Sequence, residues 1–469
     1  MKRIYNRNYF KGVLLALVLS VTSCDFGDLN VDPSALQDVP VNLILPSAEM
    51  QSARNLGSVG ARVTGVITQQ FVGIDAQPLG YNTYLIDENA LDDLWRTGLY
   101  AGAMKDCIDI IEKGRTKNIP HYTGIAKVLL AMNLGIATSF WGDVPYAEAF
   151  QGQEQLRIAY DTQESIYAEI QRLLDDAISD LNLPAGELKP GVDDPIYNGN
   201  AALWIGTARA LKARYYMHLV KRDAEAPAKA LAALNGGTIF GNSVEAAFPF
   251  GELPTEANPI AYFGTERPNQ LALGSFMLSL LDANNDPRKA KYGALSGGNY
   301  AVYVKGNTNL FWAQNNSPMP LISYSELLFI QAEAHLRLGN SIAETRYQQA
   351  IRANMEKLGI PEADITTYLT AVGSIGSLPF DEQLQRIIEQ KYLALFGQGT
   401  LEAWVDYRRT GYPAITPPAD ASESFNSTKV IPQRYLYPIS ERNTNSQNLE
   451  AAISRQGGHL LDNVLWAFQ

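Results

Sequence analysis

The sequence predicts an all-helical fold. Apolar residues recur at three- and four-residue spacing over long stretches, which is the pattern of helices that bury one face. None of the long segments alternates apolar and polar residues as a half-buried strand does. The chain has 469 residues and is 46% apolar, so it can bury a large core as one domain or as two intimate ones.

The N-terminus has the layout of a secretory signal peptide. Basic residues precede the first acidic residue, Asp25, and the apolar run over 13–19 is too short to span a bilayer. The run leads to Val21-Thr22-Ser23-Cys24, where small residues before a cysteine predict a lipobox. We therefore predict a signal peptide over 1–23, lipidation at Cys24 and a polar tether over 24–40. The alternative is an ordinary signal peptide that ends near a cysteine by chance.

The mature chain is acidic and poor in thiols. From Cys24 onward, 34 basic residues stand against 49 acidic ones, a net charge of −15. Such a surface argues against nucleic acid or anionic lipid as a partner and favours a neutral ligand. If Cys24 is lipidated, Cys107 has no cysteine to pair with, so the fold depends on its core. We expect no later stretch to be long enough to span a membrane, and therefore a soluble body.

Three helices have clear sequence signals. The first starts at Asp161, which stands three residues before Glu164 in a capping-box arrangement. The second runs from about Ala201 with apolar residues at helical spacing. The third carries an apolar stripe over 384–395 and ends at a pair of glycines.

Several helices are expected to form hairpins. Tyr324–Leu338 and Ile342–Leu358 resemble a tetratricopeptide unit of about 34 residues, because small residues at one crossing meet an aromatic residue. The repeat pattern is degenerate, which favours helical hairpins over a regular solenoid. Two more pairs follow the same pattern: Ala90–Lys113 with Tyr122–Phe140, and Ser165–Leu181 with Ala202–Val220.

The region from about 235 to 319 interrupts the helical pattern. It is rich in Gly, Pro and Asn with aromatic residues interleaved. A long irregular insertion in a helical protein is usually functional or disordered, and the aromatic content favours order. The segment Asp282–Asp286 could hold calcium, but turn formation is its expected use.

Several motifs occur in a fixed order along almost the whole chain. Trp141-Gly142-Asp143-Val144-Pro145-Tyr146, after an Ala/Leu-rich helix, resembles the GDVPY hallmark of the SusD/RagB family of outer-membrane lipoproteins. The tether segment Asp28-Leu29-Asn30-Val31-Asp32-Pro33 is similar to the start of family members after the lipid cysteine. Further similar segments are 194–200 before Trp204, 324–326 before 331–334, 389–392, 404–413 and 434–438.

This resemblance implies a right-handed helical scaffold of about four tetratricopeptide-like pairs that supports a loop-rich, ligand-binding half. It would place residues 41–469 in a single domain. It also implies that the protein sits on the cell surface as a lid over a TonB-dependent, SusC-like transporter and hands it oligosaccharides or other nutrients. No catalysis and no cofactor are expected. The chain departs from the family pattern in one respect. The acidic signal for export to the cell surface is thin, because only Asp25 and Asp28 supply it after Cys24.

Catalytic and metal-binding patterns are weak. Glu326 and Glu333 lie seven residues apart on one helical face, as a paired-carboxylate hydrolase would need, but glycosidase acids usually come from different elements. We interpret both as structural. The four histidines lack metal-type spacing, and no nucleophile elbow or phosphate loop is present. The hallmark arginines are expected to lock helices together through carboxylates: Arg408 and Arg409 with Glu389 or Asp406.

Sugar capture requires aromatic faces with planar polar side chains beside them. Two regions supply both: 69–84 followed by Trp95, and the insertion. The predicted ligand-binding residues are Trp312 and Tyr81 first, then Gln77, Tyr84, Trp95, Tyr262, Phe263, Tyr300 and Tyr303. Core packing is an equal alternative for each aromatic residue, and the favoured one for Trp95, which lies on a helix with leucines.

Three functions therefore remain open. The first is a glycan-binding module that works with a transporter. The second is a cap of the transporter with no ligand site of its own, and the third is a peptide-binding relative. A concave aromatic platform would favour the first, and aromatics buried in the insertion would favour the second. A long groove with polar side chains and exposed backbone would favour the third.

Overall fold

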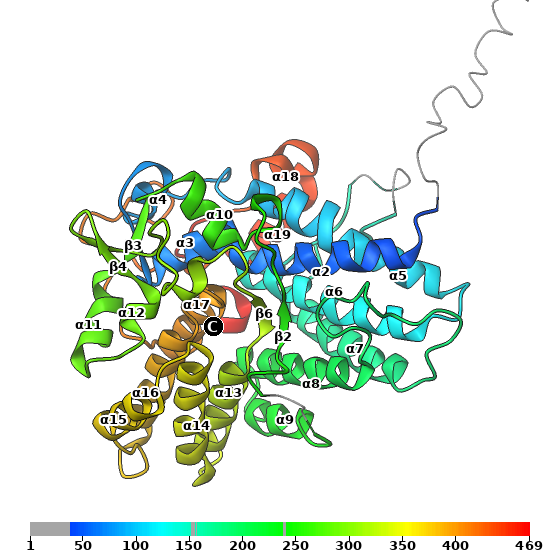
Figure 1. Cartoon of the computed structure of the whole chain (residues 1–469). Coiled ribbons are helices and arrows are strands. Elements are labelled where there is room, and N and C mark those ends of the chain that lie inside the picture. The colour runs from blue at the N-terminus through cyan, green and yellow to red at the C-terminus, as the bar shows by residue number, and fades with distance from the viewer. Residues whose placement is uncertain (1–37, 152–154, 156, 238–240) are drawn as a thin grey trace, which may run out of the picture. The chain divides into compact units, whose positions relative to one another are not determined.

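Paired helices make up most of this computed structural model (Figure 1), as the sequence predicts. The structure describes residues 38–151, 155, 157–237 and 241–469, so the predicted signal peptide, Cys24 and most of the tether lie outside the described residues. Residues Val41–Gln469 form one compact unit. Its N-terminal helices are α2 (Val41–Gly57), α3 (Val59–Ile67), α4 (Ala76–Tyr81), the π-type helix η2 (Leu94–Ala103) and α5 (Met104–Gly114).

The three predicted hairpins are confirmed. In the first, η2 and α5 precede α6 (Pro120–Trp141), which packs against α5 and α7. The second pairs α7 (Gln163–Leu181) with α8 (Ala201–His218), and the third pairs α13 (Tyr324–Arg337) with α14 (Ile342–Lys357). The remaining helices outside the insertion are α9 (Ala226–Ala233), α15 (Glu362–Val372), α16 (Phe380–Ala394), α17 (Thr400–Thr410), α18 (Ile439–Thr444), α19 (Ser446–Arg455) and η6 (Trp466–Phe468).

The start of α7 differs from the prediction by one residue, and the reason is chemical. The cap of α7 is Thr162, whose side chain accepts a hydrogen bond from the Ser165 amide. Asp161 is used elsewhere, because its carboxylate accepts the backbone amides of Tyr146 and Ala147 at 2.8 and 2.9 Å. The expected capping box at Asp161 is therefore wrong, and this carboxylate instead fixes the Trp141–Tyr146 turn.

Helix α6 corrects another expectation. It is long and apolar enough to cross a membrane by length and composition, although we expected no such segment after the signal peptide. All of its residues except His121 and Lys127 are buried inside the unit. Its apolar character on every side is thus that of a central core helix.

The insertion is ordered into short elements in the part that the structure describes. Its elements are β2 (Ala246–Phe248), η4 (Pro254–Glu256), α10 (Pro259–Glu266), β3 (Leu271–Leu273), α11 (Ser275–Ala283), α12 (Lys289–Tyr292), β4 (Ala294–Ser296), β5 (Asn299–Ala301), η5 (Phe311–Ala313) and β6 (Met319–Ile322). Strand β1 (Phe71–Gly73) pairs antiparallel with β3, with Phe71 opposite Leu273, in a sheet of order β1-β3-β5-β4. This pairing joins the 69–84 region to the insertion.

Buried ion pairs lock the helices, in part as predicted. Arg409 lies between Glu333 of α13 and Asp406 of its own helix. Glu326 receives two hydrogen bonds from Arg214 of α8, each of 2.7 Å. Both glutamates of the conceivable hydrolase pair are therefore engaged by arginines in the core, which confirms the structural interpretation.

The prediction for Arg408 is wrong. Its guanidinium stacks on the Trp404 ring at 3.6 Å and donates to the carbonyls of Ser139 and Gln433. Glu389, the other proposed partner, accepts a hydrogen bond from Gln385. Aromatic faces and carbonyls take the place of a carboxylate around Arg408, although one terminal nitrogen of Arg408 has no acceptor. Sequence spacing does not distinguish these partners.

Candidate ligand-binding cleft

A cleft of about 920 Å³ opens between the N-terminal helices and the insertion. Its volume lies in the range of small-molecule binding sites. Figure 1 shows α10 next to α2 and α3, and contacts between α10 and α2 support this placement. The cleft is lined from α2 by Gln51, Arg54 and Asn55, from α3 and its cap by Ser58, Val59 and Arg62, from α4 by Ala76 and Gln77, from η2 and its cap by Asp93, Leu94, Thr97 and Gly98, and from the insertion by Pro254, Thr255, Ala257, Pro259, Tyr262, Phe263, Glu266, Arg267 and Gln270.

Helix α10 carries the aromatic wall of the cleft. Asn258 caps the helix by accepting the Ile260 amide at 2.9 Å, and its own amide group donates to the Ser317 carbonyl. The anchored helix presents two consecutive aromatic residues to the cleft. Tyr262 is 49% exposed, and the partly buried Phe263 lies under the Arg62 guanidinium, which is 4.2 Å from the ring centroid.

A buried amide network holds the floor of the cleft. Asn55 of α2 donates to the Gly98 carbonyl of η2 and to the side chain of Asn133 in α6, both at 2.9 Å. Gln51 donates to Asn55 in turn. A Cβ atom at Gly98 would lie 2.6 Å from the Asn55 oxygen, so this close approach requires glycine. The π-type helix η2 is thereby fixed against α2, and π-helical turns are frequent at functional sites.

The cleft contains both signs of charge. Burial, together with the nearby charge of Arg267, lowers the pKa of Arg62 to about 10, and Tyr81 acts in the opposite direction. Arg62 therefore keeps its proton at neutral pH. Arg54 donates to the Thr255 carbonyl at 2.9 Å.

Three of the predicted ligand-binding residues meet in this cleft: Gln77, Tyr262 and Phe263. Gln77 also borders a second hollow of about 500 Å³, which Tyr81 lines. Tyr81 is only 3% exposed, and its buried hydroxyl has no hydrogen-bond partner. Burial raises the pKa of Tyr81 to about 12. Tyr81 thus forms a wall rather than the open stacking surface that we predicted.

Three other predicted residues are core residues. Trp312 is 2% exposed, and Tyr84 and Trp95 are each 3% exposed. Trp95 packs among Tyr100, Trp141, Tyr160 and Tyr437, in agreement with the favoured alternative, although it also borders a separate hollow of about 410 Å³. The burial of Trp312 corrects its place as the first predicted platform residue, because a buried ring has no face for a ligand.

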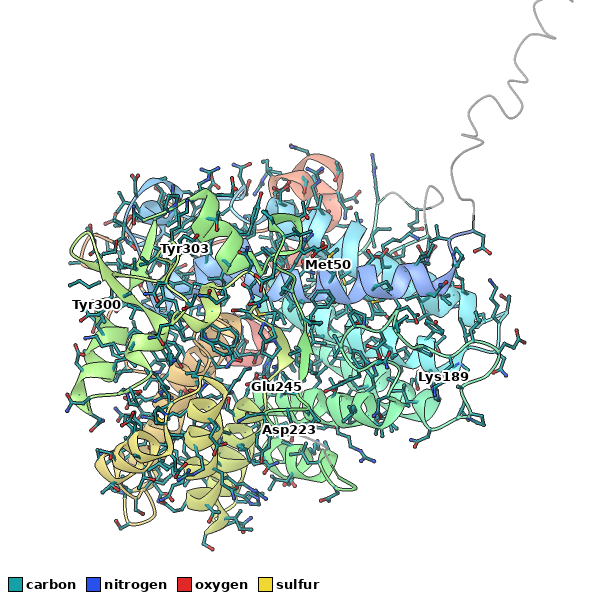
Figure 2. All side chains as sticks on the ribbon, viewed as in Figure 1. Met50, Lys189, Asp223, Glu245, Tyr300 and Tyr303 are labelled. Atoms are coloured by element: carbon teal, nitrogen blue, oxygen red, sulfur yellow. The ribbon has the colours of Figure 1, made fainter. Side chains whose placement is uncertain are left out.

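The two remaining tyrosines lie apart from each other (Figure 2). Tyr303 packs over Gly264 of α10, and its hydroxyl accepts a hydrogen bond from the Thr265 hydroxyl at 3.0 Å. It lines the small hollow that adjoins the cleft. Tyr300 lies farther out on β5, where the Lys289 ammonium is 4.2 Å from its ring centroid. Neither tyrosine lines the main cleft.

The arginines of the cleft were not predicted from the sequence. A usable signal existed, because Arg54 and Arg62 are the only basic residues between positions 41 and 70. Arg267 follows the aromatic pair Tyr262-Phe263 by four residues, but its spacing to Arg54 and Arg62 has no meaning before the chain folds. Only the packing of α10 on α2 brings the three together.

The structure gives the acidic turn in the insertion a structural role. Asp286 is buried and paired with Arg288, and Asp282 pairs with Lys289. Turn formation, the expected use of Asp282–Asp286, fits these pairings. Within the described ranges, no three His, Cys, Asp or Glu side chains come together in a way that could hold a metal ion.

Comparisons with known proteins agree with the fold. A family model described as "Starch-binding associating with outer membrane" matches residues 33–438. A solved structure of a chitin-binding SusD homolog from Flavobacterium johnsoniae is 22% identical, with a TM-score of 0.75 over 91% of this chain and 98% of that one. A SusD homolog from Bacteroides uniformis is 21% identical, with a TM-score of 0.74 over 91% of this chain and 99% of that one. The search of curated proteins found no match.

Proposed function

The chain belongs to the SusD-like family of binding proteins, and from this membership we propose that it is a glycan-binding lipoprotein of the outer membrane. It would capture oligosaccharides at the cell surface and deliver them to a TonB-dependent, SusC-like transporter. Lipidation at Cys24 would anchor it after removal of residues 1–23, leaving 24–40 as the tether. Acyl chains contribute about 0.8 kcal/mol per buried CH₂ group, which suits a soluble body held at a membrane. No catalytic step is part of the proposal.

The observation that carries the proposal is an exposed aromatic ring in a polar cleft. Pyranose rings have apolar faces that stack on aromatic side chains, and their hydroxyls need planar hydrogen-bonding groups nearby. Tyr262 offers such a ring at 49% exposure. Gln77, Gln270 and the arginines line the same cleft and supply the polar groups.

A second candidate function is a transporter cap without a ligand site. The burial of Trp312, at 2% exposure, favours this alternative, because the largest aromatic residue of the insertion serves the core. A peptide ligand is the third alternative and has no separate support in the cleft. Direct binding measurements distinguish these alternatives.

The test is affinity electrophoresis and calorimetry of the mature protein, produced without its lipid, against a panel of polysaccharides. The exposed half of Tyr262 is roughly 100 Å² of a ring that can bury about 200 Å². A sugar that covers one face removes about 50 Å² from water, or about 1.3 kcal/mol, so Tyr262→Ala should weaken binding about tenfold.

Phe380→Ala is the matched control, because Phe380 is 44% exposed at the start of α16 and outside the cleft. We expect its affinity to equal that of the unmodified protein. If a correctly folded sample bound no glycan of the panel, the glycan-capture proposal would be wrong and the cap would be favoured.

A further inference from the structure

Arg62 is a cleft residue whose charged side chain has no polar partner among the described residues. Its guanidinium carries five N–H donors, and it is partly buried above the Phe263 ring. Across the part of the chain that the structure describes, this guanidinium makes no hydrogen bond or ion pair. None of its nitrogens is among the fully buried atoms that lack a partner, and the residue lines the cleft, so its donors remain open to the cleft.

Five other buried arginines of the protein each make at least one ion pair or hydrogen bond through the guanidinium. Arg214, Arg288 and Arg409 each pair with at least one carboxylate. Arg408 and Arg434 donate to backbone carbonyls. One terminal nitrogen of Arg408 lacks an acceptor, but each of these five guanidinium groups has a carboxylate or carbonyl partner. Arg62 has neither, which favours a partner that comes from outside the chain.

A second unpaired arginine lines the same space. Arg267 borders both the cleft and the small adjoining hollow that Arg62 also lines. Its guanidinium, too, makes no hydrogen bond or ion pair with the described residues. The two cations repel each other, since the charge of Arg267 contributes to the lowered pKa of Arg62.

The carboxylates of the cleft do not neutralise this pair. Asp93 and Glu266 line the cleft, but neither forms an ion pair with Arg62 or Arg267. With Arg54 the cleft has three arginines and two carboxylates, in a chain whose formal net charge is −11. The local charge is therefore opposite in sign to that of the whole protein, and an anion would be attracted here.

We propose that Arg62 and Arg267 form a subsite for an anionic sugar, so that the ligand class is an acidic oligosaccharide rather than a neutral one. The inference rests on the proposed glycan-binding function. A carboxylate or sulfate ester on the sugar would accept hydrogen bonds from both guanidinium groups, while a neighbouring ring stacks on Tyr262. Planar guanidinium groups suit both anions, because they donate two parallel hydrogen bonds. The bound anion would also remove the repulsion between the two arginines.

The experiment compares acidic with neutral polymers by affinity electrophoresis of the mature protein. Polygalacturonate and alginate carry carboxylates, carrageenan and chondroitin sulfate carry sulfate esters, and starch and chitin oligosaccharides are neutral. We expect retardation by an acidic polymer, and a decrease in affinity of about 10- to 100-fold on chemical methyl esterification or desulfation of that polymer. The modification that causes this decrease in affinity identifies the anion as carboxylate or sulfate. Binding should also weaken as salt is raised.

Variants separate the two levels of the proposal. The variants Arg62→Gln and Arg267→Gln should each lose the preference for the charged polymer, whereas Arg62→Lys should retain part of it. Arg267 is the more exposed of the two arginines. Tyr262→Ala should weaken charged and neutral forms alike. Thermal melts check that each variant is folded, and Arg267→Gln tests the subsite if Arg62→Gln does not fold.

Two results would overturn the inference in different ways. Binding of a neutral glycan that Arg62→Gln and Arg267→Gln leave unchanged would refute the anionic subsite and leave the proposed function intact. Failure of the folded protein to bind any polymer, acidic or neutral, would refute both.

Discussion

Replacing Trp312 with alanine should destabilise the protein without altering its binding site. The indole connects η5 to distant helices. The Lys357 ammonium at the end of α14 lies 5.0 Å from its ring centroid. Gly397, at a φ of +72°, approaches the ring so closely that a Cβ there would lie 2.5 Å from the indole Cγ. The Phe311 ring meets the indole in a T-shaped contact, with ring centroids 4.8 Å apart.

The expected loss of stability follows from the buried area of the indole and from the cost of its unpaired N–H group. A tryptophan side chain that is 2% exposed buries roughly 200 Å², or about 5 kcal/mol at 25 cal/mol per Å². The indole N–H has no acceptor, so its removal returns about 1–2 kcal/mol of desolvation cost. We expect Trp312→Ala to lower the free energy of unfolding by about 3–4 kcal/mol, within the usual range for such substitutions.

The assay is urea unfolding followed by far-ultraviolet circular dichroism, combined with glycan affinity measured where both proteins are fully folded. Tyr262→Ala is the matched comparison and should change stability by less than about 0.5 kcal/mol. A loss of less than about 1 kcal/mol for Trp312→Ala, together with a loss of glycan affinity, would refute the reasoning and return Trp312 to the binding platform.

Two further predictions concern pH. His459 accepts the Tyr437 amide through Nε2 at 2.7 Å, and burial with the nearby Arg434 lowers its pKa from 6.5 to about 4. Because the unfolded chain takes up this proton first, up to about 3 kcal/mol of the free energy of unfolding should be lost as pH falls from about 6.5 to 4. His459→Gln should remove that part of the pH dependence of the urea midpoint. If the variant and the unmodified protein showed the same pH dependence across this interval, the loss would not come from His459. Glu333 is buried, which alone would raise its pKa, but Arg409 lowers the pKa from 4.5 to about 2. The contribution of the ionised Glu333 to the free energy of unfolding should therefore be present above about pH 4.5 and lost as pH falls through about 2. Glu333→Gln should cost about 3–5 kcal/mol at neutral pH, because Asp406 alone would then face the two buried cations Arg409 and Lys391 and one positive charge would stay uncompensated. A cost below about 1 kcal/mol in urea unfolding would show that the pair of Glu333 and Arg409 is not needed.

The helical hairpins could be predicted because their signals are local. Apolar spacing over 324–338 and 342–358 requires only that neighbouring turns bury one face, and the structure has helices there. Boundaries were less certain where two local groups compete for one role. Asp161 and Thr162 can both cap a helix, and the choice fell to Thr162 because the backbone amides of the Trp141–Tyr146 turn engage Asp161.

Partners of charged and aromatic side chains were less predictable. Sequence spacing correctly placed Asp406 beside Arg409, three residues away on the same helix. It could not show that Arg408 would stack on Trp404, or that Trp312 would lie under a glycine turn. An aromatic residue in an irregular segment has the same local signal whether it faces a ligand or the core.

By itself, the sequence determined the helical architecture, the ordered insertion and the family, because helical periodicity and short motifs are properties of contiguous residues. It also identified Gln77, Tyr262 and Phe263 as candidate ligand contacts. Only the tertiary structure decided which candidates meet. Strand β1 pairs with β3 some 200 residues later in the chain, and this pairing, with the packing of α10 on α2, places Arg62, Arg267 and Tyr262 around one cleft. Their distances follow from long-range packing, which has no counterpart in local spacing.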